Sequence, residues 1–147
     1  MLVRVATMVL TDHPTTSDHT GTALVTAAAV AALSRELGIH AAAQEQVWSY
    51  YLNGKHRLLC ASMVSQGSLS TSLIHPREVY KPAIAANAAA IIMVHNHPSG
   101  DPEPSAQDRE VTERIQRAGN LLGIPLLDHV IIGNGLHVSL RERGLIG

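Results

Sequence analysis

The most constraining feature of this chain is a short apolar run, residues 88–94, that leads directly into His95, Asn96 and His97. The run is continuous, contains two adjacent isoleucines and ends in turn-forming residues, which is typical of a strand buried on both faces. Because side chains alternate along a strand, we expect His95 and His97 on one face if the extended conformation persists, with Asn96 pointing away. The sequence thus predicts two neighbouring imidazoles at the end of a strand.

A proline-rich loop and a helix follow the two histidines. Three prolines and a glycine between residues 98 and 104 exclude regular structure. Ser105 is then a good N-cap, with Asp108 at the third helical position. Apolar residues continue along one helix face at Val111, Ile115, Ala118 and Leu122. Asp108 lies on that same inward face, and a metal ion held by the two histidines would explain an acid there.

Two histidines and one carboxylate make three ligands for a divalent metal. Structural zinc sites normally have four protein ligands, whereas catalytic sites keep three and leave the fourth position to water. The count favours one catalytic Zn²⁺ per chain. Taken singly, each piece has a simpler interpretation: a strand histidine is usually a hydrogen-bonded core residue, and Ser105 with Asp108 is usually only a helix start. Their combination in this order favours the metal site.

From about Glu45 to the C-terminus the chain resembles the RadC family, a bacterial branch of the JAB/MPN metalloproteins that carry the JAMM motif. The resemblance lies in the segments HPREVYKPAIAANAAAIIMVHNHPSGDPEPS and AGNLLGIPLLDHVIIG, and in the acid at Asp108. The expected strands and helices alternate, with two hairpins, which predicts a three-layer α/β domain with a mixed, curved sheet between helices, and the resemblance implies the same arrangement. We expect one domain over residues 1–147, with 1–44 as a strand-helix extension and 45–147 as the metal-site core.

The resemblance also implies roles for individual residues. His95, His97 and Asp108 correspond to the zinc ligands of the family. Ser105 corresponds to the serine that stabilises the oxyanion. The family has a glutamate at the start of the first core strand that acts through water at the metal.

Glu45 stands at the place of that glutamate, and Glu78 is its competitor. Glu78 is expected early in a helix after Pro76, where a negative charge complements the helix dipole in any case. The order of elements in the family favours Glu45 as the general base.

The remaining elements are expected at these places: a strand at 2–10, a helix at 22–37 ended by Gly38, a hairpin of 47–52 and 55–64 around a tight Asn53-Gly54 turn, a helix at 76–87 that Pro82 should kink or split, a strand at 124–132, and a second hairpin through Asn134-Gly135 to 136–140. Asp128 and His129 interrupt the apolar run of the strand at 124–132. They are either a pair that orients a metal ligand or a hydrogen-bonded polar pair at a strand end.

Composition limits the partners. The 147 residues carry a net charge of −1, so a basic field that could neutralise many phosphates is not expected, which counts against direct nucleic-acid binding. Cys60 is the only cysteine, which fits a small core residue in a reducing compartment. No apolar stretch approaches the roughly 20 residues of a membrane span, and no signal peptide is evident. We expect a cytoplasmic protein without membrane contact; its oligomeric state does not follow from the sequence.

The predicted function is a zinc-dependent metalloprotease or isopeptidase of the JAMM type that uses a metal-activated water. Its partner would be a protein or peptide, with a ubiquitin-like modifier as one candidate. The alternative is a DNA-repair or recombination accessory, or a metal-dependent nuclease, because the RadC family name is associated with repair. This chain shows no helix-hairpin-helix module ahead of the metal-site core, which counts against direct DNA engagement. A metal-free scaffold is disfavoured by the complete ligand set.

Overall fold

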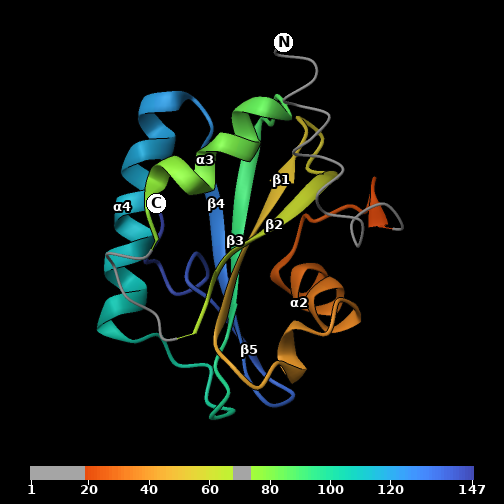
Figure 1. Ribbon diagram of the computed structural model, residues 1–147, viewed down its shortest axis with the longest axis vertical. Helices are drawn as coiled ribbons and strands as arrows, with labels where there is room; N and C mark the ends of the chain where they lie inside the picture. Colours follow the sequence, from red (N-terminus) through yellow and green to blue (C-terminus); the bar gives the residue numbers. More distant parts are fainter. Residues whose placement is uncertain (1–18, 68–73) are drawn as a thin grey trace.

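The structure, a computed structural model, describes residues 19–67 and 74–147, which form a five-stranded sheet with helices on both faces (Figure 1). The elements are α2 (Ala27–Glu36), a short 3-10 helix η2 (Ile39–Ala41), β1 (Gln46–Leu52), β2 (Leu58–Gln66), α3 (Pro76–Ala85), β3 (Ala90–Asn96), α4 (Ala106–Leu122), β4 (Leu126–Ile132) and β5 (His137–Ser139). The predicted three-layer α/β architecture is therefore confirmed. The expected strand at 2–10 lies outside the described residues.

The sheet is mixed, with strand order β2-β1-β3-β4-β5. β1 pairs antiparallel with both β2 and β3, β3 pairs parallel with β4, and β4 pairs antiparallel with β5. α4 forms the crossover that two parallel strands require. All seven residues of the central strand β3 are buried. Because β1 runs opposite to β3, with Val47 facing His95, residues just before β1 lie beside the end of β3.

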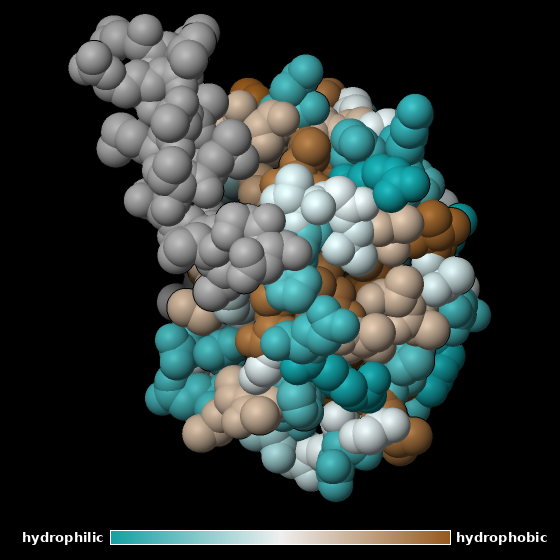
Figure 2. All heavy atoms as spheres, turned by 90° about the vertical axis from the view of Figure 1, so that its right-hand side faces the viewer, coloured by the Kyte–Doolittle hydropathy of each residue, from teal (hydrophilic) through white to brown (hydrophobic). Residues whose placement is uncertain are grey.

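Two apolar layers hold the helices to the sheet. The layer under α3 and α4 contains Tyr51, Met93 and Ile115, and the layer under α2 contains Tyr50 and side chains from β3 and β4. The adjacent tyrosines enter opposite layers because strand side chains alternate. Figure 2 views the molecule from the α2 side and shows hydrophilic side chains interspersed with apolar ones over this face. No helix within residues 19–67 and 74–147 is long and apolar enough to cross a membrane.

The first helix begins later than predicted. α2 starts at Ala27, not at residue 22, because the Thr26 side chain caps it by accepting a hydrogen bond from the backbone N–H of Ala29. The residues before Thr26 instead run along the start of β2. Gly21 N–H donates to the carbonyl of Leu58, and Leu58 N–H donates to the carbonyl of Thr22. Pairing with the edge strand β2 competes successfully with the helical preference of an alanine-rich segment.

The first hairpin also differs from the prediction. β2 begins at Leu58, so residues 53–57 form a five-residue connection in place of a two-residue turn. The Asn53 side chain accepts hydrogen bonds from the N–H groups of Lys55 and Arg57, and the left-handed conformation falls on His56, at φ 57°, not on Gly54. An asparagine side chain that satisfies backbone donors can organise a longer loop.

Pro82 does not split its helix, contrary to the prediction. α3 continues through it from Pro76 to Ala85. The proline removes one backbone hydrogen bond, to the carbonyl of Glu78 in the exposed first turn, where water can serve as the donor. The Pro82 ring is itself buried. Its packing offsets the cost of the missing bond.

Candidate metal centre

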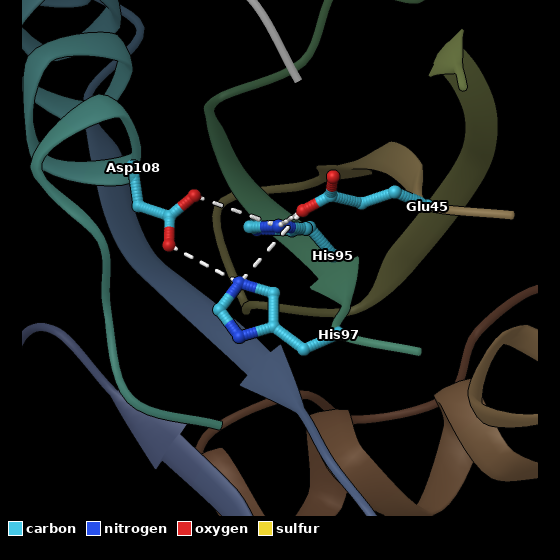
Figure 3. A group of neighbouring side chains, drawn as sticks. All are labelled: Glu45, His95, His97 and Asp108. Carbon is cyan, nitrogen blue, oxygen red and sulfur yellow. Dashed lines mark hydrogen bonds and ion pairs between the residues drawn. The ribbon is translucent and has the colours of Figure 1, made fainter. Parts of the chain in front are cut away.

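His95 and His97 stand at the end of β3 and project on the same side (Figure 3). The backbone remains extended past the strand because His97 N–H donates to the carbonyl of Ile132 on β4, at 2.9 Å. His95 is fully buried and His97 is partly exposed. Their rings meet edge to face, with centroids 4.6 Å apart. Every second side chain of a strand faces the same side, so the two imidazoles lie next to each other.

The loop after β3 fixes the orientation of the His97 ring. The Nδ1 atom of His97 lies 2.7 Å from the carbonyl oxygen of Asp101. A carbonyl only accepts, so Nδ1 carries the proton and Nε2 faces the site. The loop is held against the end of β4, where Gly133 has no room for a side chain: a Cβ atom there would lie 2.4 Å from the carbonyl oxygen of Gly100.

α4 brings Asp108 to the histidines from the next element. Ser105 caps the helix by accepting a hydrogen bond from Asp108 N–H at 3.1 Å, and its own N–H donates to Asp108 Oδ2 at 2.7 Å. This reciprocal capping box holds the carboxylate rigidly in the first turn. Asp108 is completely buried, and its Oδ2 lies 3.2 Å from His97 Nε2.

Glu45 enters from the residue before β1. Its Oε1 lies 2.8 Å from His95 Nε2 and 3.9 Å from His97 Nε2. The antiparallel pairing of β1 with β3 brings it there across 50 residues of sequence. Glu78, the competitor, lies on the exposed first turn of α3 and pairs with Arg77 at 3.6 Å. The structure brings Glu45, and not Glu78, to the two histidines.

The side chain of Asn96 holds the segment that carries Glu45. It points away from the histidines, as expected, but its function had no counterpart in the sequence analysis. Its Oδ1 accepts from Gln46 N–H at 2.6 Å, and its Nδ2 donates to the carbonyls of Gln44 at 3.1 Å and Ala42 at 3.4 Å. A fully buried amide within an apolar strand was the available signal, since buried polar groups require partners.

Donor atoms of Glu45, His95, His97 and Asp108 all lie within 4.8 Å of one another, and these four residues are called the metal group below. Among the residues that the structure describes, the buried Asp108 Oδ1 finds no hydrogen-bond donor; its near neighbour is His95 Nε2, at 3.5 Å. Two ligands of a tetrahedral zinc ion are about 3.3 Å apart, given bonds of about 2.0 Å. The distances from Asp108 to the two histidines, 3.5 and 3.2 Å, suit such an ion. The unpartnered carboxylate oxygen and the nitrogen and oxygen donors therefore fit a divalent metal.

The electrostatics of the group agree with its composition. Burial by itself raises the pKa of Asp108, but the hydrogen bond with His97 and the nearby His95 hold that pKa down to about 2. The hydrogen bond with Asp108 raises the pKa of His97, although burial opposes it. The Asp108 carboxylate and the protonated His97 imidazole therefore stabilise each other's charged forms.

The side chains of Asp128 and His129 make different contacts in the structure. The Asp128 carboxylate accepts from the Ser139 hydroxyl at 2.6 Å, from Arg141 N–H at 3.0 Å and from His129 N–H at 2.7 Å, and it binds the C-terminal turn to β4. Burial raises the pKa of Asp128, and these hydrogen bonds oppose the rise. Only the His129 ring turns toward the metal group, with Nε2 at 3.3 Å from His95 Nδ1. Burial, assisted by His95, lowers the pKa of His129.

A shallow groove of about 330 Å³ opens beside Glu45 and is lined by Gln44, Glu45, Gly67 and Pro98. Ser105 is exposed at the start of α4, where its side chain serves as the helix cap. Its oxygen accepts the bond from Asp108 N–H, so the hydroxyl hydrogen is not used in that contact. Glu45 is partly exposed where it lines this groove.

Comparisons with known proteins agree with the resemblance. A family model described as a RadC-like JAB domain matches residues 24–145. The UPF0758 protein TTE0897 of Caldanaerobacter subterraneus subsp. tengcongensis is 58% identical over 93 residues, which are 63% of this chain and 40% of that protein. The UPF0758 protein STH371 of Symbiobacterium thermophilum is 51% identical over 102 residues, 69% of this chain and 44% of that protein. A UPF0758 protein of Clostridium beijerinckii is 53% identical over 103 residues, 70% of this chain and 45% of that protein.

The chain spans less than half the length of these relatives. The family match nevertheless covers most of the chain and includes all four residues of the metal group. The family and the group together support a divalent-metal site in this chain. On the evidence of that match, of the mixed sheet and of the residues at the end of β3, the chain belongs to the family of RadC-like JAB domains.

Proposed function

We propose that this protein is a zinc-dependent hydrolase that cleaves a peptide or isopeptide bond in a protein or peptide substrate. The observation that carries the proposal is the convergence of two imidazoles and two carboxylates within 4.8 Å, with one buried carboxylate oxygen that receives no hydrogen bond from residues 19–67 and 74–147. His95, His97 and Asp108 would hold the ion. A ubiquitin-like modifier is one candidate for the protein that is removed.

A zinc ion held by these residues would act as a Lewis acid and would lower the pKa of water from about 15.7 to about 7. Glu45 is the residue placed to move protons, because its carboxylate reaches His95 on one side and the groove on the other. It would accept the proton of the attacking water and deliver it to the leaving amine, as a general base and then a general acid. The Ser105 hydroxyl would donate to the oxyanion that forms on the substrate carbonyl.

The groove supports an amide substrate over a phosphodiester. Its described lining residues, Gln44, Glu45, Gly67 and Pro98, include no lysine or arginine. Protein contacts to nucleic acid are dominated by cations on phosphates. Glu45 would repel a phosphate, whereas a neutral peptide bond meets no such barrier.

The test combines metal analysis with turnover. We expect purified protein to contain stoichiometric zinc and to cleave peptide or isopeptide-linked substrates. Glu45→Gln should keep the zinc and lose turnover by about 10²- to 10⁴-fold, the usual contribution of general acid-base catalysis. Glu78→Gln is the matched control, since Glu78 is exposed on α3 and should leave both quantities unchanged.

Three results would contradict the proposal. Wild-type protein that does not bind zinc would remove its basis. Full activity in Glu45→Gln would show that the base is misassigned. Cleavage of DNA by wild type that disappears in His97→Ala would favour the nuclease instead.

A further inference from the structure

His95 has two ring nitrogens with different surroundings. Nε2 faces Glu45 and Asp108 in the metal group. Nδ1 faces the interior, where the Nε2 atom of His129 lies 3.3 Å away. Since each imidazole nitrogen can be donor or acceptor, this contact has two possible directions, and they leave His95 Nε2 in different states.

Thr112 decides the direction. It lies one turn after Asp108 on α4 and is buried, and its hydroxyl donates to the carbonyl of Asp108 at 2.6 Å. The same oxygen lies 2.7 Å from His129 Nδ1. A hydroxyl has one hydrogen, which is already used, so Thr112 accepts from His129 Nδ1–H. The His129 ring is buried, so a neutral ring with an unprotonated Nε2 is the favoured form.

We propose that Thr112 and His129 are positioning residues that keep the proton of His95 on Nδ1 and so present its Nε2 lone pair to the metal. The chain of hydrogen bonds runs from His95 Nδ1 to His129 Nε2 and from His129 Nδ1 to Thr112. The inference rests on the metal role proposed above for His95. Neither Thr112 nor His129 belongs to the metal group.

The arrangement complements that of the second histidine. His97 has a backbone carbonyl as the partner of its Nδ1, which permits one direction only. His95 has a histidine as the partner, so its tautomer needs a further residue to define it. Outer partners of this kind typically change metal affinity by about 10- to 100-fold when they are removed.

The decisive variant is Thr112→Val, which keeps the shape of the side chain and removes the hydroxyl. His129 could then carry its proton on Nε2, which would force the proton of His95 onto the nitrogen that faces the metal. We expect zinc affinity, measured by competition with a chelator, to fall by about 10- to 100-fold. Thr112→Ser restores the hydroxyl and should recover wild-type affinity.

Ser34→Ala is the matched control. The Ser34 hydroxyl makes the same kind of bond, to the carbonyl four residues earlier at 2.7 Å, and contacts the Tyr50 hydroxyl at 2.8 Å. It is fully buried on α2, on the opposite face of the sheet. Its loss should lower stability without changing zinc affinity, which separates the proposed role from a general packing effect.

The tautomer can be measured directly in metal-free protein by long-range ¹H–¹⁵N correlation of the histidine rings. We expect a protonated Nδ1 and an unprotonated Nε2 for neutral His129, and a shift of the His129 proton toward Nε2 in Thr112→Val. Neither chelator competition nor this spectrum needs a substrate. A failure of the hydrolase proposal therefore appears separately, as absent zinc binding or absent cleavage in wild type.

A protonated Nε2 on neutral His129 in wild type would overturn the inference, as would a zinc affinity of Thr112→Val within about twofold of wild type. Should Thr112→Val fail to fold, the pair His129→Gln and His129→Phe gives the answer. Glutamine can accept from His95 and donate to Thr112, whereas phenylalanine can do neither. A zinc affinity that is greater in His129→Gln than in His129→Phe supports the inference, and an equal loss of zinc affinity in both variants refutes it.

Discussion

Single residues at the metal group serve the fold and the site together. Asp108 completes the capping box of α4 through Oδ2, while its Oδ1 lies beside His95 with no hydrogen-bond donor in the described part of the chain. Its burial is tolerable because a backbone N–H and two histidines compensate its charge. Because the capping box holds Asp108 in the first turn of α4, its second carboxylate oxygen has little freedom to move.

Cys60 illustrates the opposite case, a reactive residue type without a role in the chemistry. It is buried on β2, and burial raises the pKa of its thiol to about 11. The thiolate is the nucleophile, so we expect native protein to react with Ellman's reagent at pH 8 far more slowly than protein unfolded in guanidinium chloride. Rapid labelling of the native state, at the rate of a free thiol control, would contradict this assignment.

At the scale of elements, the site depends on how β1 and β3 are held together beyond their pairing. Asn96 ends β3 and binds residues 42, 44 and 46 by three hydrogen bonds. Gly67 at the end of β2 adds a bond from its N–H to the Glu45 carbonyl, at 2.8 Å. The segment that presents Glu45 is therefore fixed on both sides by neighbouring strands.

Asn96→Ala should loosen this segment. Three backbone groups of this partly exposed segment would lose their partner, and at about 1 kcal/mol for each hydrogen bond we expect the free energy of unfolding to fall by about 3 kcal/mol, measured by urea denaturation. Turnover should fall with it, because Glu45 is no longer held, whereas zinc affinity should fall less than in His97→Ala. Asn120→Ala, at an exposed position of α4, is the control and should change stability by less than about 0.5 kcal/mol. Turnover equal to wild type in Asn96→Ala would show that Glu45 needs no such support.

At the scale of the molecule, two aliphatic layers surround the sheet and neither depends on a metal. Each layer contains at least one fully buried tyrosine whose hydroxyl is satisfied within the protein: Tyr50 by Ser34, Tyr51 by the Val79 carbonyl and Tyr80 by the Ile115 carbonyl. The metal group lies at the end of β3, beside the layer under α3 and α4. The fold should therefore survive loss of the metal.

Removal of the metal tests this expectation. Protein treated with a chelator should keep its far-UV circular dichroism and unfold cooperatively, at a lower Tm than the zinc-loaded form. An ion present at 1,000 times its Kd stabilises by about 4 kcal/mol, which corresponds to roughly 10 °C in a domain of this size. His97→Ala should show no such zinc-dependent shift. Unfolding on metal removal would assign the ion a structural role instead.

The three-layer fold, the order of its elements and the three proposed metal ligands followed from local pattern. A continuous apolar run predicted a strand whose alternating side chains placed His95 and His97 on one side, and the cap at Ser105 placed Asp108 in the first turn of a helix. These relations are determined by the geometry of a single strand or a single helix terminus, so they can be read within about ten residues of sequence. Glu45 came from the family resemblance, not from its own surroundings.

Only the tertiary structure decided which residues support that group. The start of α2 depended on the pairing of the preceding residues with Leu58, and the intact α3 depended on the burial of Pro82. Asn96 meets the segment of Glu45 because β1 pairs antiparallel with β3, and His129 meets His95 because β4 lies parallel beside it. Sequence periodicity states which side a residue faces, whereas the partner on that side is set by strand pairing between segments 34 to 50 residues apart.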